Sequence, residues 1–587
     1  MVRIYCICLD GAPPNLLARF AMDGTMPHLG KLLSNGSWSR ALPSIPTVTP
    51  VNWTTIVTGQ HGGTHGRPHS RQGLRYFWEA AEEQGIHVGL ANIEHNPLRG
   101  SSFFVEHAEV IADALTKEVT PDETVNIPIK AEEGTEIAQA ECEISDGLRL
   151  RIKGSTARTI RARKDEMSEY AIFRAKDEER SEVCTRVRYD SIASTLYISP
   201  VRRMQGFADP PGIEKEMVSF AGPPPVRGFP LFHRGLADLD AALEEEVYHA
   251  RWYGKVAGHM MAMSEDGLWF HRHNTTDGVG HLYLGPVDPN AQSYDPATVD
   301  ANWAALRRWY SSVDLILEEI LRVDPEARFA MCTDHGNIGF SRLVSLARLF
   351  VDNGLAQPRP EAPVLLDQKA SKVFIYTNEI FVNSDPTSGP NQRASYEEVR
   401  TKAIDLLRGL IDPKVSRHVV SLAVRREEAS ALLYWGKARG DILYFLEPGY
   451  LCPGPYVMKE VFRDVRVSRH GAEHFGCLPG YEDDIGSTYS FMAFSGYHGG
   501  ERNVNALGPV HLVDFAPTVL AMMGISAPWL QGRILREMIQ EPSEDETKWE
   551  PKPPTERRVE VDGKETWMGA MRRYKEGPHR DGPKAVN

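Results

Sequence analysis

Short apolar runs separated by longer amphipathic segments recur along the chain. Residues 303–321 carry apolar side chains at helical spacing and lead into a short apolar run at 328–333. A helix-like segment through Trp78 and Ala81 is followed in the same way by an apolar run at 88–91. Because helices and strands alternate, the pattern predicts an α/β core with a mostly parallel sheet. The runs that we expect to be its strands are residues 3–9, 88–91, 267–273 and 328–333.

The pattern changes between residues 111 and 235. Short runs there alternate apolar and polar residues or are β-branched, and no long helix separates them. This pattern predicts a β-rich insertion that closes with the proline-rich loop at 222–225. A basic stretch from Arg149 to Lys164 alternates along the expected strands. We therefore interpret it as a solvated strand face rather than as a surface for a phosphorylated substrate.

Residues from about 340 to 480 form a further mixed segment, with an expected helix over 396–410 and an expected strand over 442–445. Beyond residue 540 the chain is polar and rich in Pro, Lys, Glu and Arg, which is typical of an extended tail. We therefore expect three parts, which are a core of residues 1–110 and 236–540, the insertion at 111–235, and a tail at 541–587.

Side chains that can bind metal ions follow several of the expected strands. Asp10 follows the first strand, and Asp334 and His335 are adjacent at the end of another. Asp277 and His281 are four residues apart, so both lie on one face of a helical turn. In an open α/β sheet, ligands gather outside the carboxyl ends of the strands, so these groups can converge in one crevice.

A further candidate ligand is His498, in the sequence Ser495-Gly496-Tyr497-His498-Gly499. With it, the set of carboxylates and imidazoles is large enough for a two-metal site, and such donors suit zinc or manganese. The alternative is that each Asp caps a helix and each His is an ordinary surface residue. That alternative explains any one motif, but it is a minor interpretation for all of them together.

A candidate nucleophile lies in the segment from Ile45 to Gly59. We predict that the segment is extended and then turns into a helix, with Thr49 at the N-cap and Pro50 as the first helical residue. The helix N-terminus then favours an anion beside the Thr49 hydroxyl, and metal coordination would remove the hydroxyl proton at neutral pH. In the alternative interpretation, Thr49 only caps the helix.

Short motifs along roughly residues 1–535 resemble, in sequence and in order, those of one enzyme family. They are Leu9-Asp10-Gly11-Ala12, Met26-Pro27-His28-Leu29, Asn35-Gly36, residues 46–53, Thr58-Gly59, His65-Gly66, residues 277–281, Thr333-Asp334-His335-Gly336, Tyr497-His498-Gly499, residues 512–520 and Gly524-Ile525. The chain resembles the type I phosphodiesterase/nucleotide pyrophosphatase branch of the alkaline phosphatase superfamily, and most of all its bacterial members.

The resemblance implies an alkaline-phosphatase-like three-layer sandwich around the central sheet. It also implies two zinc sites, one formed by Asp10, Thr49, Asp334 and His335 and the other by Asp277, His281 and His498. Thr49 would attack phosphorus and form a phospho-threonine intermediate that is later hydrolysed. Thr47 is the other hydroxyl nearby, but the spacing to Asn52 and Gly59 favours Thr49.

Two positions depart from the family pattern. Where the nucleotide pyrophosphatases usually have Asn-His-Tyr after the nucleophile, this chain has Asn52-Trp53-Thr54. The phosphate-contacting asparagine expected after the His-Gly motif falls near Ser70. Asn52 and Ser70 are therefore the candidate substrate-binding side chains, and the specificity for nucleotides stays open.

Composition and charge agree with a large globular enzyme. The chain has 587 residues, 42% of them hydrophobic, and a mean hydropathy of -0.35, and no run reaches the roughly 20 apolar residues of a membrane span. The first strand begins at the N-terminus, where a signal peptide would lie. A formal net charge of -13 disfavours nucleic-acid binding. Of the seven cysteines most look like small buried residues, and the lack of a CxxC pair favours a reducing, cytoplasmic compartment.

The sequence therefore predicts a metal-dependent hydrolase of phosphate esters or anhydrides. Two divalent ions are expected, with zinc preferred and manganese as the alternative, and the preferred target is a phosphodiester or pyrophosphate bond in a small molecule such as a nucleotide. A phosphomonoesterase or phosphonate hydrolase is the second interpretation, and a binding protein without turnover is the third. A sulfatase is disfavoured because its Cys-x-Pro-x-Arg motif is missing. The sequence leaves open whether the protein forms a homo-oligomer.

Overall fold

The structure is a computed structural model. The chain divides into a unit of Met1–Glu541 and a second of Pro542–Asn587, and every residue described below belongs to the first. The structure describes residues 2–66, 74–93, 102–120, 122–131, 133–153, 159–176, 181–226, 232, 237–384, 390–436, 439–464, 471–495 and 508–539. Ser70, His498 and the predicted tail lie outside the described residues.

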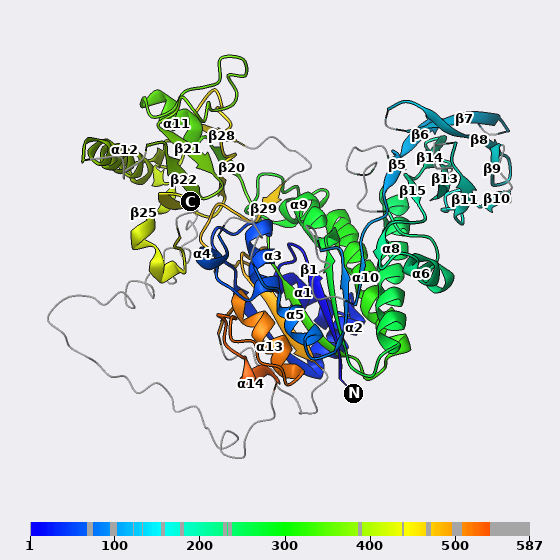
Figure 1. Ribbon diagram of the computed structural model, residues 1–587. Coiled ribbons are helices and arrows are strands. Elements are labelled where there is room, and N and C mark those ends of the chain that lie inside the picture. The colour runs from blue at the N-terminus through cyan, green and yellow to red at the C-terminus, as the bar shows by residue number, and fades with distance from the viewer. Residues whose placement is uncertain are drawn as a thin grey trace, which may run out of the picture. The chain divides into compact units, whose positions relative to one another are not determined.

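A nine-stranded mixed sheet forms the centre of this unit (Figure 1). Strand β1 (Arg3–Leu9) pairs in parallel with β17 (Gly267–His273) on one side and with β18 (Arg328–Thr333) on the other, and the bounds of all three are those predicted. In strand order the sheet is β16 (Ala208–Asp209), β4 (Phe103–Val105), β3 (His87–Ala91), β17, β1, β18, β30 (Ser490–Ser495), β2 (Gly36–Leu42) and β31 (Val510–His511).

The three middle strands end at the same level. Leu9 lies opposite both His273 and Thr333 in the paired registers. The residues that follow each strand therefore meet at one edge of the sheet, as expected for the carboxyl ends of parallel strands. Strand β30 runs antiparallel to both β18 and β2, so the sheet is mostly but not entirely parallel.

Helices cover both faces of the sheet. Alternate residues of β1 point to opposite sides, so Tyr5 and Ile7 lie in one hydrophobic cluster while Ile4 and Cys6 lie in another. The first cluster includes residues of α1 (Pro14–Met22), α2 (Pro27–Ser34), α6 (Ile213–Ala221), α8 (Leu239–Ala262), α9 (Thr275–Val287) and α10 (Val299–Val323). The second includes residues of α3 (Thr49–Thr58), α5 (Phe77–Glu82), α13 (Phe515–Met522) and α14 (Arg536–Ile539). The predicted α/β three-layer arrangement is confirmed.

Helix α10 illustrates how the hydrophobic spacing builds these layers. Its buried side chains recur every three or four residues, from Leu306 to Ile320, and it packs along α8 (Figure 1). The helix ends at Val323 because Asp324 precedes Pro325, and the residue before a proline disfavours helical geometry.

Antiparallel strands with a core of their own follow β4. They form three sheets, and β9 alternates buried and exposed residues along its whole length. The basic side chains Arg149 and Lys153 are exposed and lie beside Glu143 and Glu141, which agrees with a solvated strand face. The strands are β5 (Val110–Ala112), β6 (Leu115–Glu118), β7 (Thr124–Lys130), β8 (Glu136–Ile144), β9 (Leu148–Lys153), β10 (Ile160–Ala162), β11 (Ala171–Arg174), β12 (Glu182–Thr185), β13 (Val187–Asp190), β14 (Thr195–Ile198) and β15 (Val201–Arg203). The division of the chain into three parts stays a prediction.

The segment after β18 also has a separate core, formed around a four-stranded sheet. Its elements include α11 (Leu346–Asp352), α12 (Pro390–Arg408), β20 (Arg342–Val344), β21 (Val373–Tyr376), β22 (Glu379–Val382), β23 (Ile411–Asp412), β24 (Arg417–His418), β25 (Val420–Arg425), β26 (Ile442–Leu446), β27 (Tyr450–Leu451) and β28 (Phe462–Asp464). Strand β29 (Ala472–Glu473) then pairs with β19 (Ile338–Gly339), which brings Glu473 close to the end of β18.

The described part of the chain has no helix that is both long enough and apolar enough to cross a membrane. All seven cysteines are free and buried, whereas the sequence predicted burial for most of them. Cys8 and Cys332 are register partners on β1 and β18, with their sulfur atoms 3.4 Å apart.

Candidate metal centre

Helix α3 begins at the predicted nucleophile. Val48 is the N-cap, because its backbone is extended and its carbonyl accepts the N–H of Asn52 at 3.1 Å. The prediction that Thr49 is the N-cap and Pro50 the first helical residue is therefore wrong by one residue. No side chain caps this helix, so the Thr49 hydroxyl is not used for capping. Its Oγ1 lies instead 3.0 Å from Nε2 of His335.

Three predicted ligand atoms gather around Nε2 of His335, which is itself a predicted ligand atom. Besides Thr49 Oγ1 at 3.0 Å, they include Asp334 Oδ2 at 3.2 Å and Asp10 Oδ1 at 3.7 Å from this nitrogen. Ligands about 2.0–2.1 Å from a tetrahedral zinc ion lie about 3.3–3.4 Å from one another, so these separations suit one ion. The other ring nitrogen, Nδ1, lies 3.0 Å from the Gly336 carbonyl, and donation to it leaves the Nε2 lone pair for the ion.

The charges of this group also fit a cation. Asp10 Oδ1 and Asp334 Oδ2 are buried and have no hydrogen-bond partner among the described residues. Burial raises the pKa of Asp10, although Arg272 opposes the shift. Burial and the charge of Asp10 raise the pKa of Asp334 well above its usual value. A divalent cation would supply the positive charge that these carboxylates lack.

The second carboxylate oxygen of Asp10 binds side chains that do not belong to this group of ligands. Its Oδ2 accepts from Arg272 Nη2 at 2.7 Å and from the Trp53 indole at 3.1 Å. The Arg272 guanidinium also lies over the Trp53 ring, 4.9 Å from its centroid. Trp53, which departs from the usual family pattern, therefore orients Asp10 together with Arg272.

Gly11 is required by the close approach of two ligand-bearing segments. Its backbone has a φ of +64°, and its N–H donates to Asp334 Oδ1 at 3.1 Å. A Cβ at this position would lie 2.5 Å from Asp277 Oδ1. Glycine adopts this left-handed backbone without strain, and because it has no Cβ it leaves room for the Asp277 carboxylate.

A second group of ligand atoms lies beside the first. Asp277 and His281 face each other on α9, with Oδ1 and Nε2 3.4 Å apart. The His281 Nδ1 lies 2.7 Å from the Ala472 carbonyl, and donation to it directs Nε2 toward Asp277. Burial alone would raise the pKa of Asp277 and lower the pKa of His281. The interaction between the two side chains outweighs burial, so the pKa of Asp277 is lowered and the pKa of His281 is raised to about 10. A metal ion would replace the proton that the pair shares.

Sequence reasoning missed two members of the second group. Glu473 Oε1 lies 3.9 Å from His281 Nε2, and the His474 ring stacks on the His335 ring at 3.9 Å between centroids. Ligand atoms of Asp277, His335 and His474 lie within 4.8 Å of one another, as do those of His281, Glu473 and His474. The sequence signal that could have revealed them is the adjacent pair Glu473-His474. It places an acidic residue directly before a histidine, as Asp334-His335 does after β18.

Of the remaining predicted site residues, the structure describes Asn52 but neither His498 nor Ser70. Asn52 is buried, its Oδ1 accepts from the Ser44 N–H at 2.7 Å, and its Nδ2 donates to the Val48 carbonyl at 3.3 Å. Its side chain therefore fixes the segment that leads into α3. His498 and Ser70 lie outside the described residues, so their predicted roles stay predictions.

Residues 5–93, which include Asp10 and Thr49, match the family described as type I phosphodiesterase/nucleotide pyrophosphatase. The predicted family resemblance is confirmed over this segment. No curated protein sequence gives a significant match.

Several solved structures of low sequence identity are similar to the chain. Phosphonoacetate hydrolase from Sinorhizobium meliloti 1021 is 13% identical, over 88% of this chain and 94% of that one, with a TM-score of 0.42. The alkaline phosphatase PafA is 12% identical, over 92% and 99%, with a TM-score of 0.46. Murine ectonucleotide pyrophosphatase/phosphodiesterase 5 is 11% identical, over 92% and 100%, with a TM-score of 0.40.

Proposed function

We propose that the protein is a metal-dependent hydrolase that cleaves a phosphodiester or pyrophosphate bond in a small molecule, with Thr49 as the nucleophile. The observation that supports this most is the position of the Thr49 hydroxyl. Its Oγ1 lies at the start of α3, 3.0 Å from His335 Nε2, in the same group as the carboxylates of Asp10 and Asp334. A hydroxyl that only capped the helix would bind a backbone N–H of the first turn, whereas the Thr49 hydroxyl lies against His335, which groups with Asp10 and Asp334.

The residues divide between two ion sites. Thr49, Asp10, Asp334 and His335 would hold one ion. Asp277, His281 and His498 would hold the other, with Glu473 and His474 as further ligands on that side. When bound, the ions would lower the pKa of the nucleophile and stabilise the charge on the phosphoryl oxygens.

The protein itself supplies the nucleophile and its orientation. Thr49 Oγ1 would bond to phosphorus as the bond to the leaving group breaks, and water would then cleave the phospho-threonine and restore the hydroxyl. The N-terminus of α3 favours negative charge at this position because the positive end of the helix dipole lies there. Arg272 and Trp53 would keep Asp10 aimed at the site through its outer oxygen.

The test compares three variants on a panel of p-nitrophenyl monoesters and diesters, nucleotides and phosphonates. Thr49→Ala should lower turnover by about three orders of magnitude or more, since it removes a group that acts as a unit with its activators. Thr49→Ser should retain more activity because the hydroxyl remains. The matched control is Thr47→Ala, which removes a buried hydroxyl two residues away and should change turnover little.

The panel also separates the alternative functions. A clear preference for monoesters or phosphonates would replace the proposed substrate class while leaving the nucleophile in place. Near-normal turnover in Thr49→Ala would contradict the covalent mechanism. Zinc-dependent binding of phosphate esters with no turnover in the wild type would favour a binding protein.

A further inference from the structure

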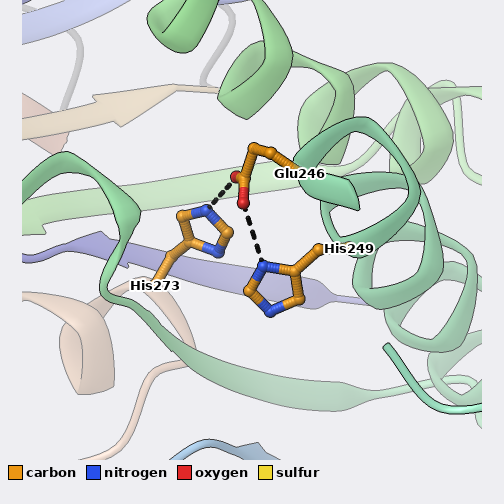
Figure 2. A group of neighbouring side chains, drawn as sticks. All are labelled: Glu246, His249 and His273. Atoms are coloured by element: carbon orange, nitrogen blue, oxygen red, sulfur yellow. Dashed lines mark hydrogen bonds and ion pairs between the residues drawn. The ribbon is translucent and has the colours of Figure 1, made fainter. Parts of the chain in front are cut away.

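A further cluster of metal-binding side chains consists of residues that belong to neither of the two groups described above. Glu246 and His249 belong to α8, and His273 is the last residue of β17. The Glu246 carboxylate lies between the two imidazoles, with Oε1 2.8 Å from His273 Nε2 and Oε2 3.1 Å from His249 Nδ1 (Figure 2). One ligand atom from each residue lies within 4.8 Å of the other two.

The cluster is almost completely removed from solvent. Glu246 and His273 are 0% exposed and His249 is 5% exposed. Among the described residues, no lysine or arginine forms an ion pair with the Glu246 carboxylate. A carboxylate in such a place must be paired with a positive charge or coordinate a metal ion, because burying an unpaired charge is very costly.

Each imidazole faces the Glu246 carboxylate with one ring nitrogen and turns the other nitrogen away from it. His249 Nε2 and His273 Nδ1 also have no hydrogen-bond partner among the described residues, so two buried ring nitrogens remain unsatisfied. A divalent metal ion requires neutral imidazoles and an ionised carboxylate as ligands, and each ring would bind it through the nitrogen that faces Glu246.

We propose that Glu246, His249 and His273 form a separate zinc site. Two imidazoles and one carboxylate are a common ligand set for zinc, and the borderline donors favour it over calcium or magnesium. Thr275 supplies a hydroxyl next to the set, since its Oγ1 donates to Glu246 Oε2 at 2.9 Å. Because the cluster is buried, the ion would be taken up as the chain folds.

The position of this site gives it a structural role. It joins the middle of α8 to the end of β17 and to Thr275, the first residue of α9. The carbonyl of His273 accepts the backbone N–H of Asp10 at 2.9 Å, and α9 carries Asp277 two residues after Thr275. An ion here would fix the strand end and the helix start that present ligands to the catalytic centre.

The competing explanation is a hydrogen-bond network without an ion. The separations of 2.8 and 3.1 Å are hydrogen-bond lengths, whereas ligands of one tetrahedral zinc ion lie about 3.3–3.4 Å apart. Zinc binding therefore requires the side chains to move apart by a few tenths of an ångström. The network explanation predicts that the protein binds no zinc through Glu246.

Zinc content distinguishes the two explanations. The full chain is saturated with Zn²⁺, freed of loosely bound metal, and analysed as wild type, Glu246→Gln, His249→Gln and Glu245→Gln. Glu245 is the matched control, because it is the next residue on α8, is 4% exposed, and lies 3.6 Å from Arg186 instead of facing the histidines. We expect Glu246→Gln and His249→Gln each to hold one zinc ion fewer per chain than the other two proteins.

Equal zinc content in all four proteins would overturn the proposal. If the ligand variants do not fold, crystals of the wild type grown with Zn²⁺ give a second test. Anomalous scattering at the zinc edge should show a peak between Glu246, His249 and His273, and its absence would overturn the proposal. A peak here without one beside Thr49 would contradict the proposed function alone, so the two ideas fail separately.

Discussion

Replacing Arg272 with methionine should weaken zinc binding beside Thr49. Arg272 donates to Asp10 Oδ2 through Nη2 at 2.7 Å and Nε at 3.2 Å, and its side chain is 11% exposed. Methionine keeps much of the apolar stem and removes both donors. Residues that orient a ligand in this way typically contribute 10- to 100-fold in metal affinity, which is about 1.4–2.8 kcal/mol. Since Trp53 still donates to the same oxygen, we expect a loss near the middle of that range.

The assay is competition for Zn²⁺ against a chromophoric chelator, with the thermal midpoint as a check on folding. The matched control is Arg342→Met, because Arg342 is also mostly buried, at 14% exposure, and lies 2.9 Å from Asp412 in the segment after β18. Arg342→Met should lower the thermal midpoint without changing zinc affinity. Arg272→Lys should lie between wild type and Arg272→Met, because lysine keeps the charge but lacks the planar fork. A folded Arg272→Met protein with wild-type zinc affinity would refute this reasoning.

Three further results are expected. Gly11→Ala should lower zinc content and turnover at least about tenfold, because its methyl would lie 2.5 Å from Asp277 Oδ1 on a left-handed backbone; wild-type zinc content would contradict this. Glu473→Gln should weaken zinc binding on the His281 side, and unchanged affinity would exclude this carboxylate as a ligand. The free energy of unfolding of the chelated protein should fall between pH 7 and pH 5. Burial holds the pKa of His271 well below its usual 6.5, so the unfolded chain binds a proton there that the folded chain excludes; an equally steep profile in His271→Phe would contradict this cause.

Much of the sheet could be predicted because its strands are short, buried and continuous in sequence. The bounds of β1 and β18 follow from apolar runs that polar residues succeed, whereas β17 continues an apolar run through His271, Arg272 and His273. The start of α3 was harder to predict. Val48 and Thr49 both lie within two residues before Pro50, so either could be the N-cap. Backbone geometry, and not the better capping side chain, decided that Val48 is the N-cap.

Other parts of the candidate site depend on contacts between distant segments. Glu473 reaches the site through β29, a strand of two residues whose pairing with β19 leaves no hydrophobic pattern in the sequence. Glu246 and His249 lie in a long helix, where their spacing matches that of ordinary helix neighbours. Only the packing of α8 against β17 brings His273 to them, so periodicity alone could not reveal the cluster.

The most direct test of the central claim is a search for the covalent intermediate. The wild type and Thr49→Ala are mixed with bis(p-nitrophenyl) phosphate, quenched in acid within the first turnovers, digested and analysed by mass spectrometry. The proposed mechanism requires a p-nitrophenyl phosphate group on Thr49 in the wild type, with release of p-nitrophenolate, and no adduct in Thr49→Ala. Rapid turnover by wild type with Thr49 unmodified, or with the group on Thr47, would contradict it.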